Sequence, residues 1–324
     1  MSFDIQIIKA RTDAALGRKE MWRSLLKDAY EYFLPQREVW DYYSPGTTKT
    51  TRIYDSTGQV AIKEFANRMM SAITPQGQVW AEMVPGLNHP KEIRENKEVL
   101  AKLSEVNRVL FEYINQSNFY TIIGESYLDL AIGTAGVTIE EGDADSPLVF
   151  GIINQAEVGY EIGPSGLIEN VFRKRTHQAV NIPRAYPDGK YSVRVTDAVN
   201  KKDHTAECVV IECMIFEPKT KNYWLLVYEE GQPDFIWQVN RGKASPWIIY
   251  RWAVTHGEIR GRGPVLDALP DQRSLNKVKE FALQKAAIEL AGLWTGQDDG
   301  VFNPYTINVQ PGVIIPVSTN LTSN

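Results

Sequence analysis

The chain has 324 residues, of which 43% are hydrophobic and 23% charged, proportions that fit a folded protein of about two domains. Its formal net charge of −5 argues against a protein that grips nucleic acid through a basic surface, because neutralising phosphates takes clustered lysine and arginine. No run approaches the roughly twenty apolar residues that span a bilayer, so we expect no membrane partner and a chain kept in the cytoplasm.

The first part of the chain, residues 1–134, predicts a helical layer, because apolar side chains recur there at spacings of three and four. We expect four helices, separated by turn and loop residues. They are a helix capped by Thr12 or Asp13 and stopped by Pro35, a helix from Asp55 or Ser56 to Thr74, a helix around Leu100–Ile114, and a helix from Phe119 to Ile132 that Gly133 ends. Residues 42–51 are expected to form a polar loop between the first two.

After Gly133 apolar residues alternate with polar ones, which predicts an antiparallel β region over residues 135–256. Nine strands are expected, at residues 137–139, 148–153, 158–162, 168–176, 191–196, 206–216, 223–228, 235–239 and 247–252. The aromatic residues of this region could form a carbohydrate or base-stacking platform, but their alternation in strands favours core packing. Cys208 and Cys213 are an odd number of positions apart, so they should face opposite sides of one strand and form no disulfide.

Residues 257–291 predict a glycine loop followed by helices. Gly257, Gly261 and Gly263 give the loop conformational freedom, as a hinge would need, and Pro264 presets the first helical turn. Pro270 should break this first short helix, and a second helix should run from Asp271 to Leu290.

The second of these helices divides into an apolar and a polar set of positions. The apolar set is wider than one stripe, so the helix should pack against neighbours on two sides, as in a ring. The expected packing residues are Leu275, Val278, Phe281, Ala282 and Ala286, and the polar and charged residues are Arg273, Lys277, Lys279, Glu280, Gln284 and Lys285.

Two stretches together resemble a known family. Gly257-Glu-Ile-Arg-Gly-Arg-Gly-Pro264, followed by Asp267-Ala-Leu-Pro-Asp271 and Leu275-Asn-Lys277, resembles a segment of the head-to-tail connector, or portal, proteins of short-tailed, T7-like bacteriophages. The stretch from Tyr54-Asp55-Ser56-Thr57-Gly58 through Thr74-Pro75 to Trp80 also resembles that family, in which a helical layer precedes a Trp-containing strand.

This resemblance implies a portal-like α+β fold. Residues 1–134 would be the helical part of a wing, residues 135–256 its antiparallel β part, residues 257–291 a stem helix region and residues 292–324 the start of a clip. Family members usually continue into a second stem helix and a crown, so the resemblance also implies that a C-terminal part is missing after Asn324.

The implied role is structural, with no enzymatic activity, no cofactor and no metal. Portal subunits form a ring of twelve copies at one capsid vertex, through which double-stranded DNA is packaged and ejected without sequence specificity. Phage terminase, tail adaptor and capsid proteins would be the partners, and the protein would reside in the virion after assembly in the host cytoplasm. The charged and polar set on the long helix would face the channel, although its lysines could equally balance Glu280 and Glu289 in solvent.

A second class of function remains open at this point. A cytosolic protein could bind a nucleotide or another ligand at the Gly261–Gly263 loop, which lies between a strand and a helix as in dinucleotide-binding folds. Two residues weaken this reading, because Leu266 replaces the third glycine and Pro264 removes a backbone donor. The four histidines lack metal-binding spacing, and Asp298-Asp299 is typical of a solvated turn, so no catalytic residue is expected.

Overall fold

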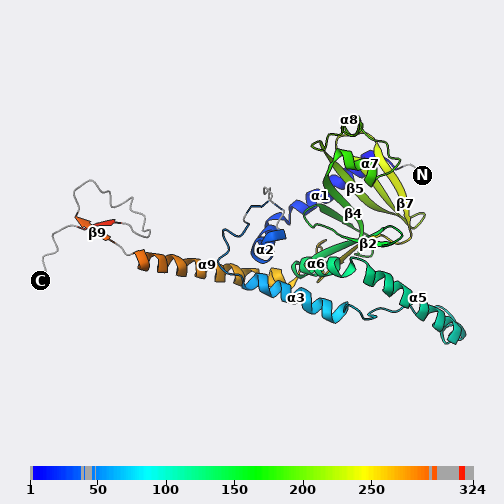
Figure 1. Ribbon diagram of the computed structural model, residues 1–324, viewed down its shortest axis with the longest axis horizontal. Helices are drawn as coiled ribbons and strands as arrows, with labels where there is room; N and C mark the ends of the chain where they lie inside the picture. Colours follow the sequence, from blue (N-terminus) through cyan, green and yellow to red (C-terminus); the bar gives the residue numbers. More distant parts are fainter. Residues whose placement is uncertain are drawn as a thin grey trace.

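The computed structural model describes residues 3–37, 40, 46–47, 49–291, 294–297 and 314–317, the last two ranges as backbone. A body of helices and antiparallel sheets lies at one end of the molecule, and one long helix projects from it (Figure 1). The α+β class expected from the sequence is confirmed. The predicted loop at residues 42–51 is described only in part, and Asp298 and Asp299 lie outside the described residues.

Six helices precede the sheets in the part of the chain that is described. They are α1 (Ile5–Glu20), α2 (Arg23–Phe33), α3 (Thr57–Ile73), α4 (Lys91–Arg94), α5 (Lys97–Gln116) and α6 (Phe119–Ile132), with a short 3₁₀ turn, η1 (Pro35–Arg37), after α2. The predicted start of the first helix at Thr12 or Asp13 is wrong. Asp4 caps α1 by accepting a hydrogen bond from the Gln6 backbone N–H, and Thr12 lies buried inside the helix.

A five-stranded antiparallel sheet forms most of the β region, in the order β3-β4-β5-β6-β7. Its strands are β3 (Val158–Ile162), β4 (Ile168–Gln178), β5 (Glu207–Glu217), β6 (Asn222–Glu229) and β7 (Phe235–Gly242). Helix α1 packs on one face, and η2 (Ala179–Asn181), α7 (Ile182–Ala185) and α8 (Val193–Lys201) cover the other. Cys208 belongs to the core under α8 and Cys213 to the core under α1, so the predicted opposite orientation is confirmed.

The expected strand at residues 191–196 is wrong, because this segment begins helix α8. The Ser192 hydroxyl accepts a hydrogen bond from the Val195 backbone N–H and so caps the helix. Val195 and Ala198, three positions apart, are buried in the core, whereas Val193 is exposed. The alternation of valines suggested a strand, but burial follows the helical spacing.

A smaller antiparallel sheet, β2-β1-β8, links the body to the long helix. It consists of β1 (Thr134–Glu141), β2 (Leu148–Ile152) and β8 (Trp247–Arg251). Ala135 and Phe150 pack against α6, so this sheet holds the C-terminal end of α6 beside the end of β8.

Helix α9 (Pro264–Ala291) is the projecting helix, and it runs through Pro270 without interruption. The predicted break at Pro270 is therefore wrong. Proline removes the hydrogen bond to the Leu266 carbonyl, but burial of Val265, Leu266 and Leu269 against α2 and α3 offsets that loss. Beyond the helix, β9 (Trp294–Gln297) pairs in parallel with β10 (Ile314–Val317). No helix in the described ranges is long and apolar enough to cross a membrane.

Candidate functional site: the junction between the body and helix α9

The glycine loop between β8 and α9 folds back onto the end of α6. Three consecutive backbone N–H groups of the loop donate hydrogen bonds of 2.9 Å: Gly261 to Thr134 Oγ1, Arg262 to the Ala253 carbonyl, and Gly263 to the Ile132 carbonyl. These bonds join α9 to both β1 and α6. A nucleotide phosphate in this loop would have to accept hydrogen bonds from the same N–H groups, which are already used within the chain. This argues against a nucleotide site in the loop.

Two of the glycines are required by close backbone approach. A Cβ at Gly263 would lie 2.2 Å from the Ala131 carbonyl oxygen, and one at Gly261 would lie 2.3 Å from that of Gly133. Only Gly257 of the three predicted loop glycines has a positive φ, at 81°. The loop is thus tightly packed at Gly261 and Gly263, and its role as a hinge remains a prediction.

Arg260 fixes the loop to the edge of the large sheet. Its guanidinium is buried, with the residue 3% exposed, and donates hydrogen bonds to Gln155 Oε1 at 2.9 Å and to the Val158 carbonyl at 2.9 Å. It also lies 5.0 Å from the centre of the Tyr160 ring. Burial lowers the pKa of Arg260, and the carbonyl oxygens around it stabilise its positive charge.

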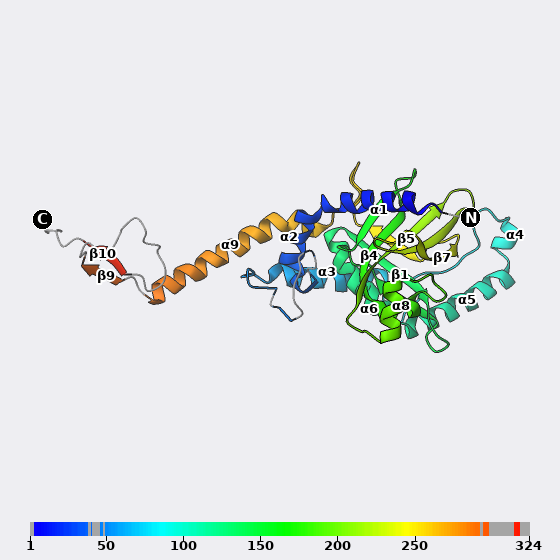
Figure 2. The ribbon, with the colours of Figure 1, turned by 90° about the horizontal axis from the view of Figure 1, so that it is seen from above.

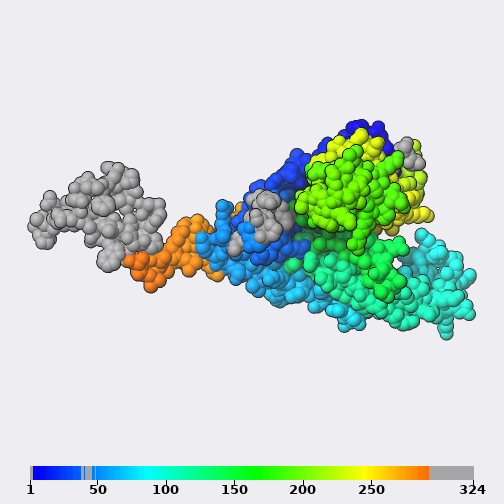
Figure 3. Space-filling view, turned by 45° about the horizontal axis from the view of Figure 1, so that its top comes forward, coloured from blue at the N-terminus to red at the C-terminus, as the bar shows by residue number. Residues whose placement is uncertain are grey.

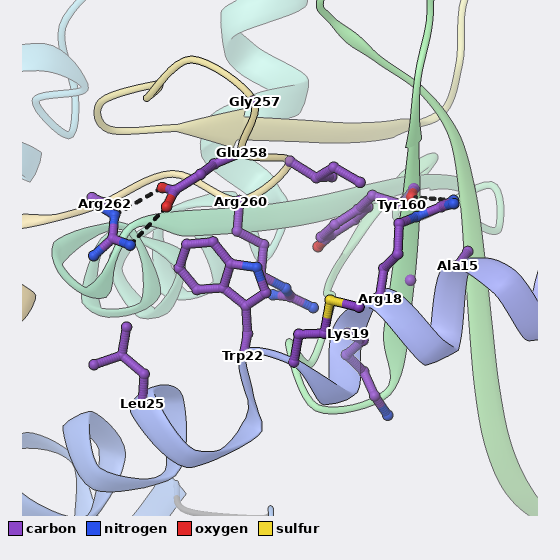
Figure 4. Close-up of a pocket in the computed structure, with 13 residues that line it drawn as sticks. Ala15, Arg18, Lys19, Trp22, Leu25, Tyr160, Gly257, Glu258, Arg260 and Arg262 are labelled. Atoms are coloured by element: carbon purple, nitrogen blue, oxygen red, sulfur yellow. Dashed lines mark hydrogen bonds and ion pairs between the residues drawn. The ribbon is translucent and has the colours of Figure 1, made fainter.

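A cavity of about 350 Å³ opens beside Arg260, between the α1–α2 elbow and the loop (Figure 4). Trp22 lines it, with the Arg262 guanidinium 5.3 Å from the centre of its ring. Arg262 is held in turn by Glu258 through two hydrogen bonds of 2.7 and 2.8 Å. The cavity wall therefore combines an aromatic face with several cations.

A second set of contacts fastens the base of α9 to residues 52–57, and we call it the latch: Asp55, Gln272, Asn276 and Lys279. Asn276 Oδ1 accepts hydrogen bonds from the backbone N–H groups of Tyr54 (2.7 Å) and Asp55 (3.1 Å), and Asn276 Nδ2 donates to the Arg52 carbonyl at 3.0 Å. Gln272 Nε2 donates to Asp55 Oδ1 at 3.2 Å. Asn276 thus binds the backbone of the segment before α3 through three hydrogen bonds.

The Asp55 carboxylate is buried and forms an ion pair with Lys279. This contact with Lys279 holds the pKa of Asp55 well below its usual range, against the opposing effect of burial. Arg273 forms an ion pair with Asp28 of α2. Two of the residues predicted to face a channel, Arg273 and Lys279, therefore contact the body of their own chain.

A buried carboxylate also lies near the junction, on α6. Asp129 accepts hydrogen bonds from the Tyr30 hydroxyl at 2.8 Å and from Arg37 at 3.1 Å. Burial outweighs both partners and raises the pKa of Asp129 to about 6. This carboxylate links α2, η1 and α6, and the start of α9 packs against α2 and α6.

The distal half of α9 is exposed in the single chain. Between Lys277 and Ala291 no residue is buried, and Val278 and Phe281 are 64% and 56% exposed. The other apolar residues predicted to pack in a stem, Leu275, Ala282 and Ala286, are exposed as well. The polar set forms pairs within the helix, Lys277 with Glu280 at 2.8 Å, Lys285 with Glu289 at 3.6 Å, and Gln284 with Glu280 at 3.3 Å.

The sequence did not reveal the latch or the Asp129 cluster. Residues 54–58 and 267–277 lie far apart in the sequence, and only the structure shows that Asn276 and Gln272 bind the segment that contains Asp55. The sequence signal that could have linked the two stretches is that both resemble the same protein family. In the described part of the chain, no group of three or more His, Cys, Asp or Glu residues is arranged to hold a metal ion.

Comparison with known proteins identifies the class to which this architecture belongs. Residues 6–323 match the family described as bacteriophage head to tail connecting protein, so the chain belongs to that family, a structural family of the phage virion. Among curated proteins, the chain is similar to the probable portal protein of Bordetella phage BPP-1, with 24% identity over 285 residues. That match covers 83% of this chain and 50% of the relative, so the chain spans about half the length of the curated protein it matches.

Proposed function

We propose that this protein is a portal subunit, which assembles into a ring at one capsid vertex. Double-stranded DNA would pass through the ring during packaging and ejection, and terminase, tail adaptor and capsid proteins would dock on it. The observation that carries this proposal is helix α9, which projects from the body (Figure 2). Its distal half carries exposed apolar side chains. A helix with exposed apolar residues needs a partner, and copies of the same helix around an axis supply one.

The proposed division of the chain follows the junction. Residues 1–134 and 135–256 would form the wing, residues 257–291 the stem and residues 292–324 the start of the clip. A helix of the length of α9 spans about 42 Å at 1.5 Å per residue. The latch and the glycine loop support this division, because both fix the stem to the wing at one end only.

The residues proposed to line the channel lie on the distal half of α9. Arg273 and Lys279 are engaged by Asp28 and Asp55 within the chain, which leaves Lys277, Glu280, Gln284 and Lys285 as the better candidates. These four carry little net charge and pair mainly among themselves and with Glu289. Such a surface would let DNA slide, because few phosphate contacts would have to break as it advances.

The substitution Phe281→Asp tests the stem assignment. If Phe281 packs between neighbouring copies, the new carboxylate would be buried without a partner and assembly should fail while the monomer stays folded. Gln284→Asp, which adds the same side chain at an exposed polar position of the same helix, is the matched control. Native mass spectrometry gives the oligomer distribution, and an unchanged distribution for Phe281→Asp would contradict the assignment.

Duplex binding tests the channel assignment. We expect weak binding that is lost at moderate salt and does not depend on sequence, because the net charge of −5 supplies few phosphate contacts. A salt titration with random and defined duplexes measures it. Nanomolar, sequence-dependent binding at physiological salt would point to a regulator instead of a conduit.

A further inference from the structure

An arm extends from the body between α3 and α6, and we define it as residues 74–117. It consists of an extended segment, the short helix α4 and helix α5. Figures 2 and 3 show it standing beside the β region. More than a third of the exposed large apolar side chains in the described part of the chain lie on this arm or at Ile73 beside it, although these residues make up about a seventh of the sequence.

The arm is held to its own body by one face of α5 and by Thr74 and Trp80 of the extended segment. Trp80 stacks on Phe119 of α6, with ring centres 5.6 Å apart, and meets Phe111 edge-on at 5.3 Å. Asn107 accepts a hydrogen bond from the Met83 N–H at 2.9 Å and donates one to the Met83 carbonyl at 3.3 Å. The extended segment, which resembled a Trp-containing strand, has no strand partner among the described residues.

A second face of α5 carries an apolar stripe that is exposed over its C-terminal part and half-buried at Val99 and Leu103. Val99, Leu103, Val106, Leu110 and Tyr113 follow one another at spacings of four and three, the pattern of a helix that packs along a neighbour. Val106 is 51% exposed and Tyr113 is 44% exposed. This open stripe lies beside the buried face that contains Asn107 and Phe111, and the single chain leaves its C-terminal part, Val106, Leu110 and Tyr113, exposed.

The exposed apolar side chains of the arm extend along its whole length. Ten large apolar residues between Ile73 and Tyr113 are each 37–86% exposed. Apolar surfaces that a monomer leaves open in this way mark contacts with other molecules. Exposure on this scale indicates a surface that another molecule covers.

We infer that the open stripe of α5 packs against the neighbouring copy of this same chain. This inference rests on the proposed function, because a ring places an identical copy beside every subunit. Closure of a ring requires a head-to-tail interface, in which the arm meets a different surface of its neighbour. Helix α9, with its exposed apolar residues, and the arm lie at opposite ends of the molecule (Figure 1). A contact that runs along the whole subunit therefore needs an apolar surface at the end formed by the body as well. The arm supplies that surface.

The test combines a double variant with hydrogen exchange on the full chain. Val106→Asp with Leu110→Asp places two carboxylates on the open stripe, and Ala101→Asp on the solvent side of α5 is the control. We expect the double variant to lower the assembled fraction at least tenfold by native mass spectrometry, with an unchanged circular dichroism spectrum, and the control to assemble as the wild type does. In the wild type, amide exchange over residues 99–113 should slow at least tenfold on assembly.

The outcomes separate this inference from the proposed function. A wild-type chain that stays monomeric at every concentration would refute the ring, and the inference with it. A wild-type ring in which the double variant assembles normally and α5 exchange is unchanged would overturn the inference alone. If the double variant misfolds, the wild-type exchange rates still decide between slower exchange, which supports the contact, and unchanged exchange, which refutes it.

Discussion

Replacing Gly263 by alanine would place a methyl group against the backbone at the end of α6. Its Cβ would lie 2.2 Å from the Ala131 carbonyl oxygen and 2.7 Å from the Ile132 carbonyl carbon, and neither backbone atom can rotate away. Overpacking of a rigid site costs about 1–3 kcal/mol, and loss of the hydrogen bond from Gly263 to Ile132 adds about 1 kcal/mol. We therefore expect Gly263→Ala to lower the free energy of unfolding by about 2–4 kcal/mol.

Two other glycines serve as matched controls in the same assay. At Gly257 a Cβ would meet nothing within 4 Å, so only the positive φ costs energy, about 1 kcal/mol. At Gly17, inside α1, a Cβ again meets nothing, and alanine should stabilise the helix by about 0.5–1 kcal/mol. Urea unfolding followed by tryptophan fluorescence measures all three. A Gly263→Ala midpoint equal to or above that of Gly257→Ala would refute the close-packed junction.

Two further perturbations test the latch and the buried carboxylate. Asn276→Ala should lower the free energy of unfolding by about 2–3 kcal/mol, because it leaves the Tyr54 and Asp55 backbone donors without an acceptor. Gln284→Ala, on the exposed half of α9, should change this free energy little. Equal effects of the two substitutions in urea unfolding would contradict the latch. Because the pKa of Asp129 is raised to about 6 from an unfolded value near 4, its neutral form is favoured by folding, so this stability is present below about pH 4 and is lost as pH rises through 6. The loss is about 3 kcal/mol, and Asp129→Asn should flatten this part of the stability profile between pH 4 and 7; an unchanged slope would show that Asp129 is not its source.

Much of the fold could be predicted from the sequence, because its signals are local. Alternation of apolar residues located eight strands, and spacing of three and four located the longer helices. The errors arose where tertiary contacts outweighed the local pattern. Alternating valines at residues 193 and 195 suggested a strand, yet the Ser192 cap and the core under α8 favour a helix. Pro270 suggested a break, yet the contacts of Leu266 and Leu269 keep α9 continuous.

The junction was only half predictable for a related reason. A glycine-rich loop before a proline marks a junction in any sequence, but the partner that makes Gly261 and Gly263 necessary is the end of α6, about 130 residues earlier. Asn276 likewise binds a backbone segment about 220 residues away, and this pairing cannot be deduced from a single sequence. The charges on α9 showed which residues could face a channel, but only the structure shows that Arg273 and Lys279 pair with Asp28 and Asp55.

Assembly of the full chain is the most direct test of a portal role. Native mass spectrometry combined with negative-stain images measures both the number of copies and the shape of the particle. We predict a closed ring with a central channel, with the α9 helices grouped around its axis. A small globular particle of one or two copies at all protein concentrations would contradict it.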